Sequence, residues 1–209
     1  MPGTPTSKGE GLIRTHDLLE VLRSDIGQAY ETLEANRESQ YLRRCVVRAI
    51  FSFIEAVVEC IKVEVRSTIR GGGFAKPLSA REMETLGALH LVPPPIGRFL
   101  ALDDNIKRTF RLAAKVWGLE FQLRTGGEDF RDFLAAKRAR DRLTHPRTFY
   151  DVEVMDHDMH CHTVAGMWLQ SEFKRLFRAR IESLSKDLPE DDRAAFLQHF
   201  AGKEKRPGS

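Results

Sequence analysis

The sequence predicts an all-α fold, an up-and-down bundle of four long helices with additional short helices. Apolar residues recur at spacings of three and four in several long segments, and no series of alternating segments indicates a set of strands. Charged residues make up 30% of the chain and hydrophobic residues 42%, which is ordinary for a folded protein. A chain of 209 residues is long enough for one domain with a full core.

We expect that domain to cover residues 11–203. The first ten residues contain two prolines and two glycines, so we predict a disordered tail over 1–10. Residues 204–209 are predicted to form a second disordered tail.

The N-terminal half predicts two long helices, over residues 12–38 and 40–69. The second is apolar around much of its circumference, which is typical of a central helix. Glu55 lies in its most apolar stretch, where an unpaired carboxylate would be costly to bury. Two interpretations follow: a salt bridge at the helix edge, or a carboxylate that acts by orienting an active-site arginine.

A glycine-rich and proline-rich region follows the second helix. Gly71–Gly73 lacks the Gly-Lys-Ser/Thr that completes a phosphate-binding loop, so we interpret it as a flexible connection. Ser79 and Glu82 have the spacing of a capping box and predict a short helix to about His90. Pro93–Pro95 is expected to act as a stiff spacer.

The C-terminal half predicts four further helices, over residues 100–122, 128–144, 160–185 and 190–201. Alternation of apolar and acidic residues over 151–154 favours an extended segment.

Charge and cysteine content limit the classes of function. A net charge of +3 does not by itself indicate a nucleic-acid-binding protein, so any such argument depends on local clusters. Three widely spaced cysteines indicate neither a disulfide framework nor a zinc ribbon. The N-terminus has no apolar core typical of a secretory signal, and the longest apolar stretch is interrupted by charged residues. We therefore expect a cytoplasmic protein without a membrane span.

The strongest cluster of basic residues lies at the end of the helix predicted over 128–144. It comprises Lys137, Arg138, Arg140, Arg142 and Arg147. Pro146 disfavours helical geometry at the residue before it, so the chain should leave the helix at about His145. Such an exit would allow the side chains of Arg140 and His145 to converge on one ligand.

The hexapeptide Arg140-Asp141-Arg142-Leu143-Thr144-His145 resembles the motif of the HEPN superfamily, the higher eukaryotes and prokaryotes nucleotide-binding domain. That motif is an arginine, a polar residue, three to five further residues and a histidine, late in a four- or five-helix bundle. Two other arginines precede a histidine at a similar distance, but each is followed by alanine. Asp141 is polar, although asparagine is commoner there in the family.

The resemblance implies a metal-independent endoribonuclease, a toxin or defence effector that works as a homodimer with both motifs facing one cleft. It implies no cofactor, and an antitoxin or a nucleotidyltransferase as a further partner. A histidine with a pKa near ~6.5 is suited to take a proton from a ribose 2′-hydroxyl. A forked, permanently charged arginine is suited to bind the attacked phosphate. His145 and Arg140 would have these roles, with Asp141 as the polar member of the motif.

Alternatives remain open at this site. Arg140 and His145 are also what a solvated helix end would carry, because basic side chains favour helix C-termini. Lys137, Arg138, Arg142 and Arg147 are candidate RNA contacts, or a solvated face. The basic stretch 174–180 is a further candidate RNA track, or the outer face of its helix. The alternative function is a non-catalytic HEPN module that binds a nucleotide, RNA or a protein partner.

A rival site lies in Asp156–His162, which holds three histidines, two aspartates and a cysteine. Zinc sites usually require a further group of ligands, and none is visible in the sequence. We interpret this stretch as a solvated loop before the helix predicted over 160–185, and a metal-dependent phosphodiesterase is the third hypothesis.

Overall fold

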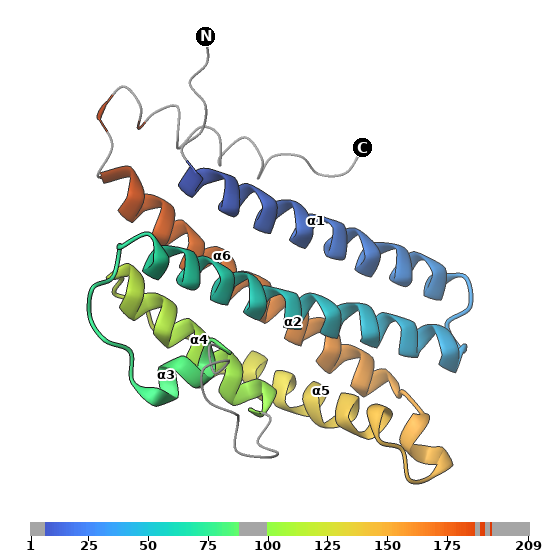
Figure 1. Cartoon of the computed structure of the whole chain (residues 1–209). Helices are drawn as coiled ribbons and strands as arrows, with labels where there is room; N and C mark the ends of the chain where they lie inside the picture. The colour runs from blue at the N-terminus through green and yellow to red at the C-terminus, as the bar shows by residue number, and fades with distance from the viewer. Residues whose placement is uncertain (1–6, 88–99, 187–188, 191–192, 194–209) are drawn as a thin grey trace.

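The computed structural model describes residues 7–87, 100–186, 189–190 and 193. Over these residues the chain is helical and contains no strand, which confirms the all-α prediction. The helices are α1 (Ser7–Glu34), α2 (Gln40–Arg70), α3 (Ala80–Thr85), α4 (Leu102–Trp117), α5 (Glu128–Thr144), the 3-10 helix η2 (Phe149–Val152) and α6 (Asp156–Lys186) (Figure 1). Among the described residues no helix is both long and apolar enough to cross a membrane.

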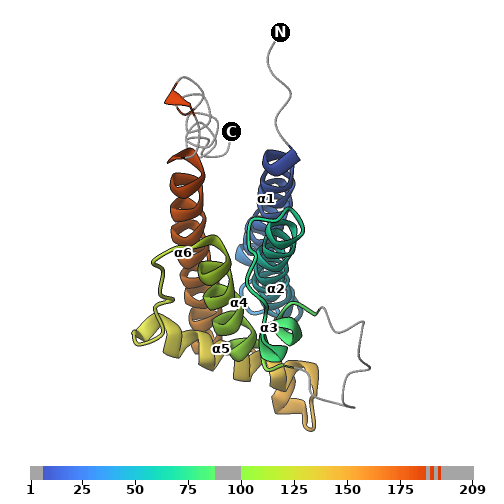
Figure 2. The same cartoon turned by 60° about the vertical axis from the view of Figure 1, so that its left-hand side comes forward.

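Helix α2 is the central element, as its apolar circumference predicts. It packs against α1 on one side and against α4 and α6 on the other (Figure 2). Its fully buried side chains include Val46, Ile54, Val57 and Ile61. Because the hydrophobic effect scales with the apolar area removed from water, this helix contributes a large share of the core.

Helix ends follow local chemistry. The predicted capping box of α3 is present, with the Ser79 hydroxyl accepting from the Glu82 N–H and the Glu82 carboxylate accepting from the Ser79 N–H. The carboxylate also interacts with Lys115, and these contacts lower the pKa of Glu82 to about 2. Helix α4 ends before Gly118, whose φ of 65° is left-handed and suits glycine.

Helix α3 ends at Thr85, short of the predicted end at about His90, and Gly87 follows it with a left-handed φ of 65°. Two other helix boundaries also differ from the predictions. Helix α1 begins at Ser7 and ends at Glu34, whereas residues 12–38 were predicted; its first residues fall within the predicted tail 1–10. Extending an existing helix by one turn costs far less than nucleating one, which accounts for the early start. The segment predicted over 100–122 stops being helical at Trp117, because Gly118 ends it.

Two local predictions before α6 were wrong in whole or in part. Residues 149–152 form the 3-10 helix η2, so the first half of the extended segment predicted over 151–154 is wrong, whereas Glu153 is extended with φ −80° and ψ 136°. The stretch Asp156–His162, predicted as a loop, is the first part of α6. The Asp158 carboxylate accepts from the Met155 N–H and so caps the start of α6, which lies four residues before the predicted start at 160. The proline spacer, the helix predicted over 190–201 and the tail at 204–209 lie outside the described residues, Glu190 and Arg193 excepted.

Candidate active site at the end of α5

Helix α5 covers residues 128–144, as the sequence predicts, and the chain leaves the helix at His145, as Pro146 predicts. One face is buried through Phe130, Phe133, Ala136 and Ala139. Residues two apart on a helix point ~200° away from each other, whereas residues four apart share a face. The arginines at 138, 140 and 142 therefore lie on two sides of α5.

Arg140 faces α2. Its Nη2 donates to Glu55 Oε1 at 2.8 Å, and its Nη1 donates to Asp141 Oδ1 at 3.3 Å. The guanidinium carbon lies 5.8 Å from the centre of the Phe51 ring, within the range of a cation–π contact. The Arg140 side chain is 34% exposed, so the group is held in place yet open to a ligand. The contact between Glu55 and Arg140 is common to both interpretations of Glu55.

His145 caps the end of α5. Its backbone N–H donates to the Asp141 carbonyl oxygen at 3.1 Å, and its φ of −127° takes it out of the helix. Its side chain is exposed and has no hydrogen-bond or ion-pair partner among the described residues. The structure brings Arg140 to Glu55, and it does not bring Arg140 into contact with His145 within one chain.

Arg142 holds the connection between α5 and α6. It donates to the carbonyl oxygens of Asp151 and Glu153, at 3.3 and 2.8 Å, and to Asp158 Oδ2 at 3.0 Å. These donors are engaged inside the protein, so we do not include Arg142 among the RNA contacts proposed below.

The other basic side chains predicted to contact RNA lie apart from one another. Lys137 pairs with Asp141 at 3.4 Å and with Asp103 of α4 at 3.7 Å. Arg138 is exposed on the α6 side of α5, away from Arg140. The Arg147 side chain is exposed and without a partner among the described residues, and only its backbone N–H is engaged.

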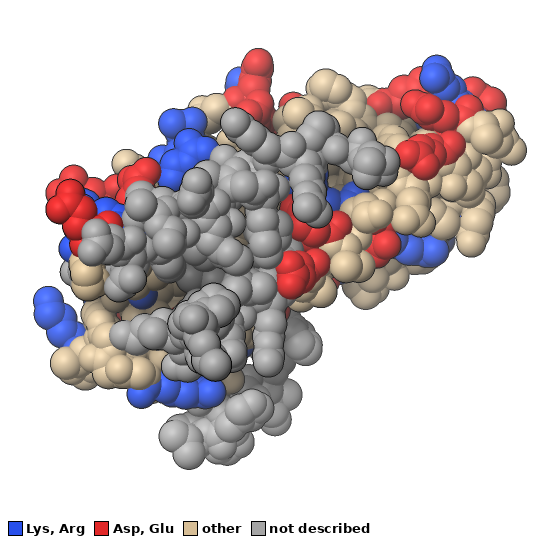
Figure 3. Space-filling model, turned by 90° about the horizontal axis from the view of Figure 1, so that it is seen from above, with Lys and Arg blue, Asp and Glu red and all other residues tan. Residues whose placement is uncertain are grey.

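In the second basic stretch, 174–180, Arg175 and Arg180 pack against other parts of the protein, whereas Lys174 and Arg178 are exposed. Arg175 binds the buried carboxylate of Glu172, and the Arg180 guanidinium lies over the Trp117 ring at 5.3 Å. The face in Figure 3 carries acidic side chains beside basic ones, with no continuous basic surface among its described residues. The RNA track considered for this stretch stays a prediction.

Arg48 on α2 is a candidate that the sequence analysis missed. Arg44, Arg48 and Glu55 follow helical spacing and share the face of α2 that runs from η2 to Arg140. Arg44 marks one end of this face, donating to the Val152 carbonyl oxygen at 2.9 Å, and Glu55 marks the other. The Arg48 side chain is exposed and without a partner among the described residues. Arg48 lies seven residues, about two helical turns, before Glu55, and this spacing could have identified it from the sequence.

The helical geometry of α6 places the side chains of the rival stretch, Asp156–His162, on different faces. His157 and Cys161 share a face, with 3.6 Å between Nε2 and Sγ, and burial raises the pKa of the Cys161 thiol. His162 is fully buried, and burial lowers its pKa. Nowhere in the described part of the chain do three such side chains form a group that could hold a metal ion.

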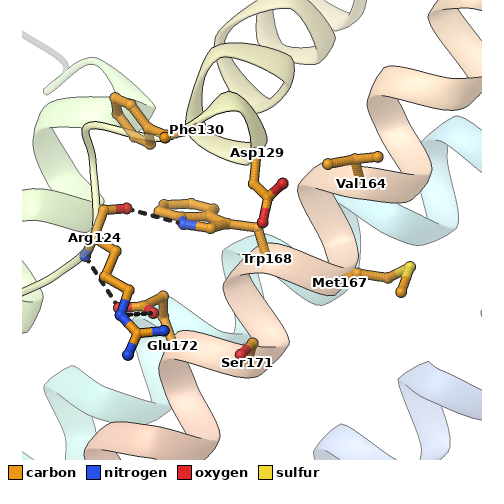
Figure 4. A pocket seen from close by; sticks show the side chains of 9 residues that line it. Arg124, Asp129, Phe130, Val164, Met167, Trp168, Ser171 and Glu172 are labelled. Atoms are coloured by element: carbon orange, nitrogen blue, oxygen red, sulfur yellow. Dashed lines mark hydrogen bonds and ion pairs between the residues drawn. The ribbon is translucent and has the colours of Figure 1, made fainter.

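A cavity of about 410 Å³ lies at the opposite end of α5 (Figure 4). Its wall includes Trp168, Phe130 and Glu172. Trp168 Nε1 donates to the Arg124 carbonyl oxygen at 3.0 Å, and the Arg124 N–H donates to Glu172 Oε2 at 3.1 Å. These bonds fasten the loop before α5 to α6, and the wall contains none of the predicted site residues.

Comparison with family models, curated proteins and solved structures found no match to this chain.

Proposed function

We propose that the chain is a metal-independent endoribonuclease of the HEPN type that acts as a homodimer. The observation that carries the proposal is the placement of Arg140, a partly exposed guanidinium fixed by Glu55 from a neighbouring helix. It stands five residues before His145, whose exposed imidazole has no protein partner among the described residues. These are the two groups that cleavage through the ribose 2′-hydroxyl requires.

In the proposed reaction His145 accepts the proton of a 2′-hydroxyl as that oxygen attacks the adjacent phosphorus. The bond from phosphorus to the 5′-oxygen breaks, and that oxygen receives a proton from His145 of a second copy. The products are a 2′,3′-cyclic phosphate and a 5′-hydroxyl. Arg140 stabilises the charge that builds on the phosphate oxygens. Arg48 and Arg147, both free of protein partners in the described structure, would bind neighbouring phosphates.

A second copy of the chain fits this scheme. Arg140 pairs with Glu55, and the His145 side chain makes no contact with Arg140, so we infer that a site using both groups on one phosphate is completed between two chains. An antitoxin or nucleotidyltransferase partner stays a prediction of the family resemblance.

The test is cleavage of labelled RNA in EDTA, with detection of cyclic-phosphate ends. We expect cleavage by the native protein, and His145→Ala should abolish it without changing the fold. His160→Ala, which removes an exposed histidine from α6, is the matched control and should cleave normally. Undiminished cleavage by His145→Ala would refute the proposed base.

The second candidate function is a non-catalytic HEPN module that binds RNA, a nucleotide or a protein partner. The observation in its favour is that Glu55 and Asp141 both pair with Arg140, which offsets the positive charge available to a transition state. RNA binding without cyclic-phosphate products would favour this function over the nuclease.

A further inference from the structure

Two exposed aromatic side chains lie directly beyond the end of α5. Phe149 is 74% exposed and Tyr150 is 75% exposed, the highest values among the large hydrophobic side chains of the described residues. Their ring centres are 6.0 Å apart with the planes at 78°. Adjacent apolar side chains that are this exposed are typical of a binding surface.

The aromatic pair stands on a fixed turn. Asp151 Oδ2 accepts from the backbone N–H groups of Arg147 and Thr148, both at 2.8 Å, and these bonds lower the pKa of the Asp151 carboxyl. Arg142 and Arg44 hold the same turn from α5 and α2, through the carbonyl oxygens of Asp151 and Val152. A backbone held in this way presents its side chains at a lower entropic cost on binding than a free loop would.

The side chains available beside the pair are basic. His145 and Arg147 lie within four residues of Phe149, and Arg48 lies on the face of α2 that leads to the same turn. All three are exposed and without partners among the described residues. The carboxylate nearest along the chain, that of Asp151, is occupied by the cap of the turn. This surface therefore complements a ligand that has flat apolar groups and negative charges.

We propose that Phe149 and Tyr150 form a stacking platform for the bases of single-stranded RNA. The proposal rests on the proposed function, because it names the substrate of that same site. Four residues span at most about 14 Å, so a base on the platform lies close to the phosphate at His145. Unpaired bases expose their faces for aromatic stacking, whereas the bases of a duplex do not. The platform selects single strands over duplexes.

The experiment measures the binding of fluorescently labelled single-stranded RNA by anisotropy, in EDTA and on the His145→Ala background so that no cleavage interferes. Phe149→Ala and Tyr150→Ala should each weaken binding by about tenfold. Tyr150→Phe keeps the ring and should bind normally. Met167→Ala removes a side chain that is 65% exposed on α6, and it is the matched control with no expected effect.

An abasic position in the RNA provides the decisive comparison. If a base stacks on the platform, removing it should weaken binding to the same extent, and the aromatic substitutions should then have little further effect. Equal binding by the aromatic variants, or an equal loss with duplex RNA, would overturn the proposal. A change from dimer to monomer in sedimentation, with unchanged RNA binding per chain, would also overturn it and assign the surface to protein contacts.

These outcomes are separate from those of the proposed function. If the native protein cleaves no RNA but the aromatic variants lose single-strand binding, the nuclease proposal fails and the platform stands. If cleavage occurs and the aromatic variants bind normally, the platform fails and the nuclease stands.

Discussion

Replacing Glu55 with alanine should impair catalysis far more than stability. Glu55 Oε1 lies 2.8 Å from Arg140 Nη2, with the side chains 49% and 34% exposed. Exposed ion pairs contribute roughly 0.2–1 kcal/mol, and alanine is the best helix former for this position in α2. We therefore expect the free energy of unfolding to change by less than about 1 kcal/mol.

The expected effect on cleavage is larger because Arg140 loses its ion pair with α2. The bond to Asp141 and the Phe51 ring remain, but both allow the guanidinium to shift. A displacement of about 1 Å can lower a rate by 10²-fold, so we expect kcat/KM to fall about 10- to 100-fold. Glu55→Gln keeps an oxygen acceptor and should retain an intermediate rate.

The assay combines urea denaturation with cleavage of single-stranded RNA in EDTA. Glu31→Ala, which removes from α1 an exposed carboxylate that has no partner among the described residues, is the control and should match the native protein in both measurements. A native cleavage rate in Glu55→Ala would refute the positioning role of this carboxylate. A loss of more than about 2 kcal/mol in stability would show that the pair is a structural contact, against its exposure.

Two further predictions concern the elements that support the site. Arg142→Ala should lower the free energy of unfolding by about 2 kcal/mol, because it removes the donors to Asp158 and to two carbonyl oxygens, whereas Arg138→Ala should change it by less than about 0.5 kcal/mol; urea denaturation measures both. Burial lowers the pKa of His162, with Asp158 opposing and Arg142 adding to the shift, so the unfolded chain binds the proton more readily. The contribution of neutral His162 to the free energy of unfolding should be fully present above about pH 6.5 and decline as the pH falls below it. In unfolding experiments between about pH 5 and 8, His162→Leu should show a weaker decline.

Periodicity predicted the helices best where the sequence also contained their end signals. Residues 128–144 follow Gly126 and Gly127 and precede Pro146, and the helix has the predicted bounds. The α4 boundary was missed because apolar residues continue past Gly118 and preserve the helical pattern. The pattern records which residues are apolar, but the chain turns where glycine takes a left-handed conformation.

The start of α6 was missed for a different reason. Polar residues dominate Asp156–His162, so the stretch has the composition of a loop. Several of its side chains nevertheless contact protein: His162 is buried beside Phe51, Cys161 is buried, and Asp158 caps the helix and binds Arg142. Pairs such as Arg142 and Asp158 are sixteen residues apart and belong to different helices, so no local pattern could have predicted them.

The candidate site shows how helical geometry gives neighbouring arginines different roles. Arg138 and Arg142 share the face of α5 that turns toward α6, and Arg142 is engaged there in holding the chain connection. Arg140, ~200° away from both, faces α2 and meets Glu55. A run of basic residues in the sequence therefore does not form one basic surface. Arg140 is the arginine of this run that lies on the α2 face with Glu55, and under the proposed function this face, rather than the number of positive charges, is where the phosphate would bind.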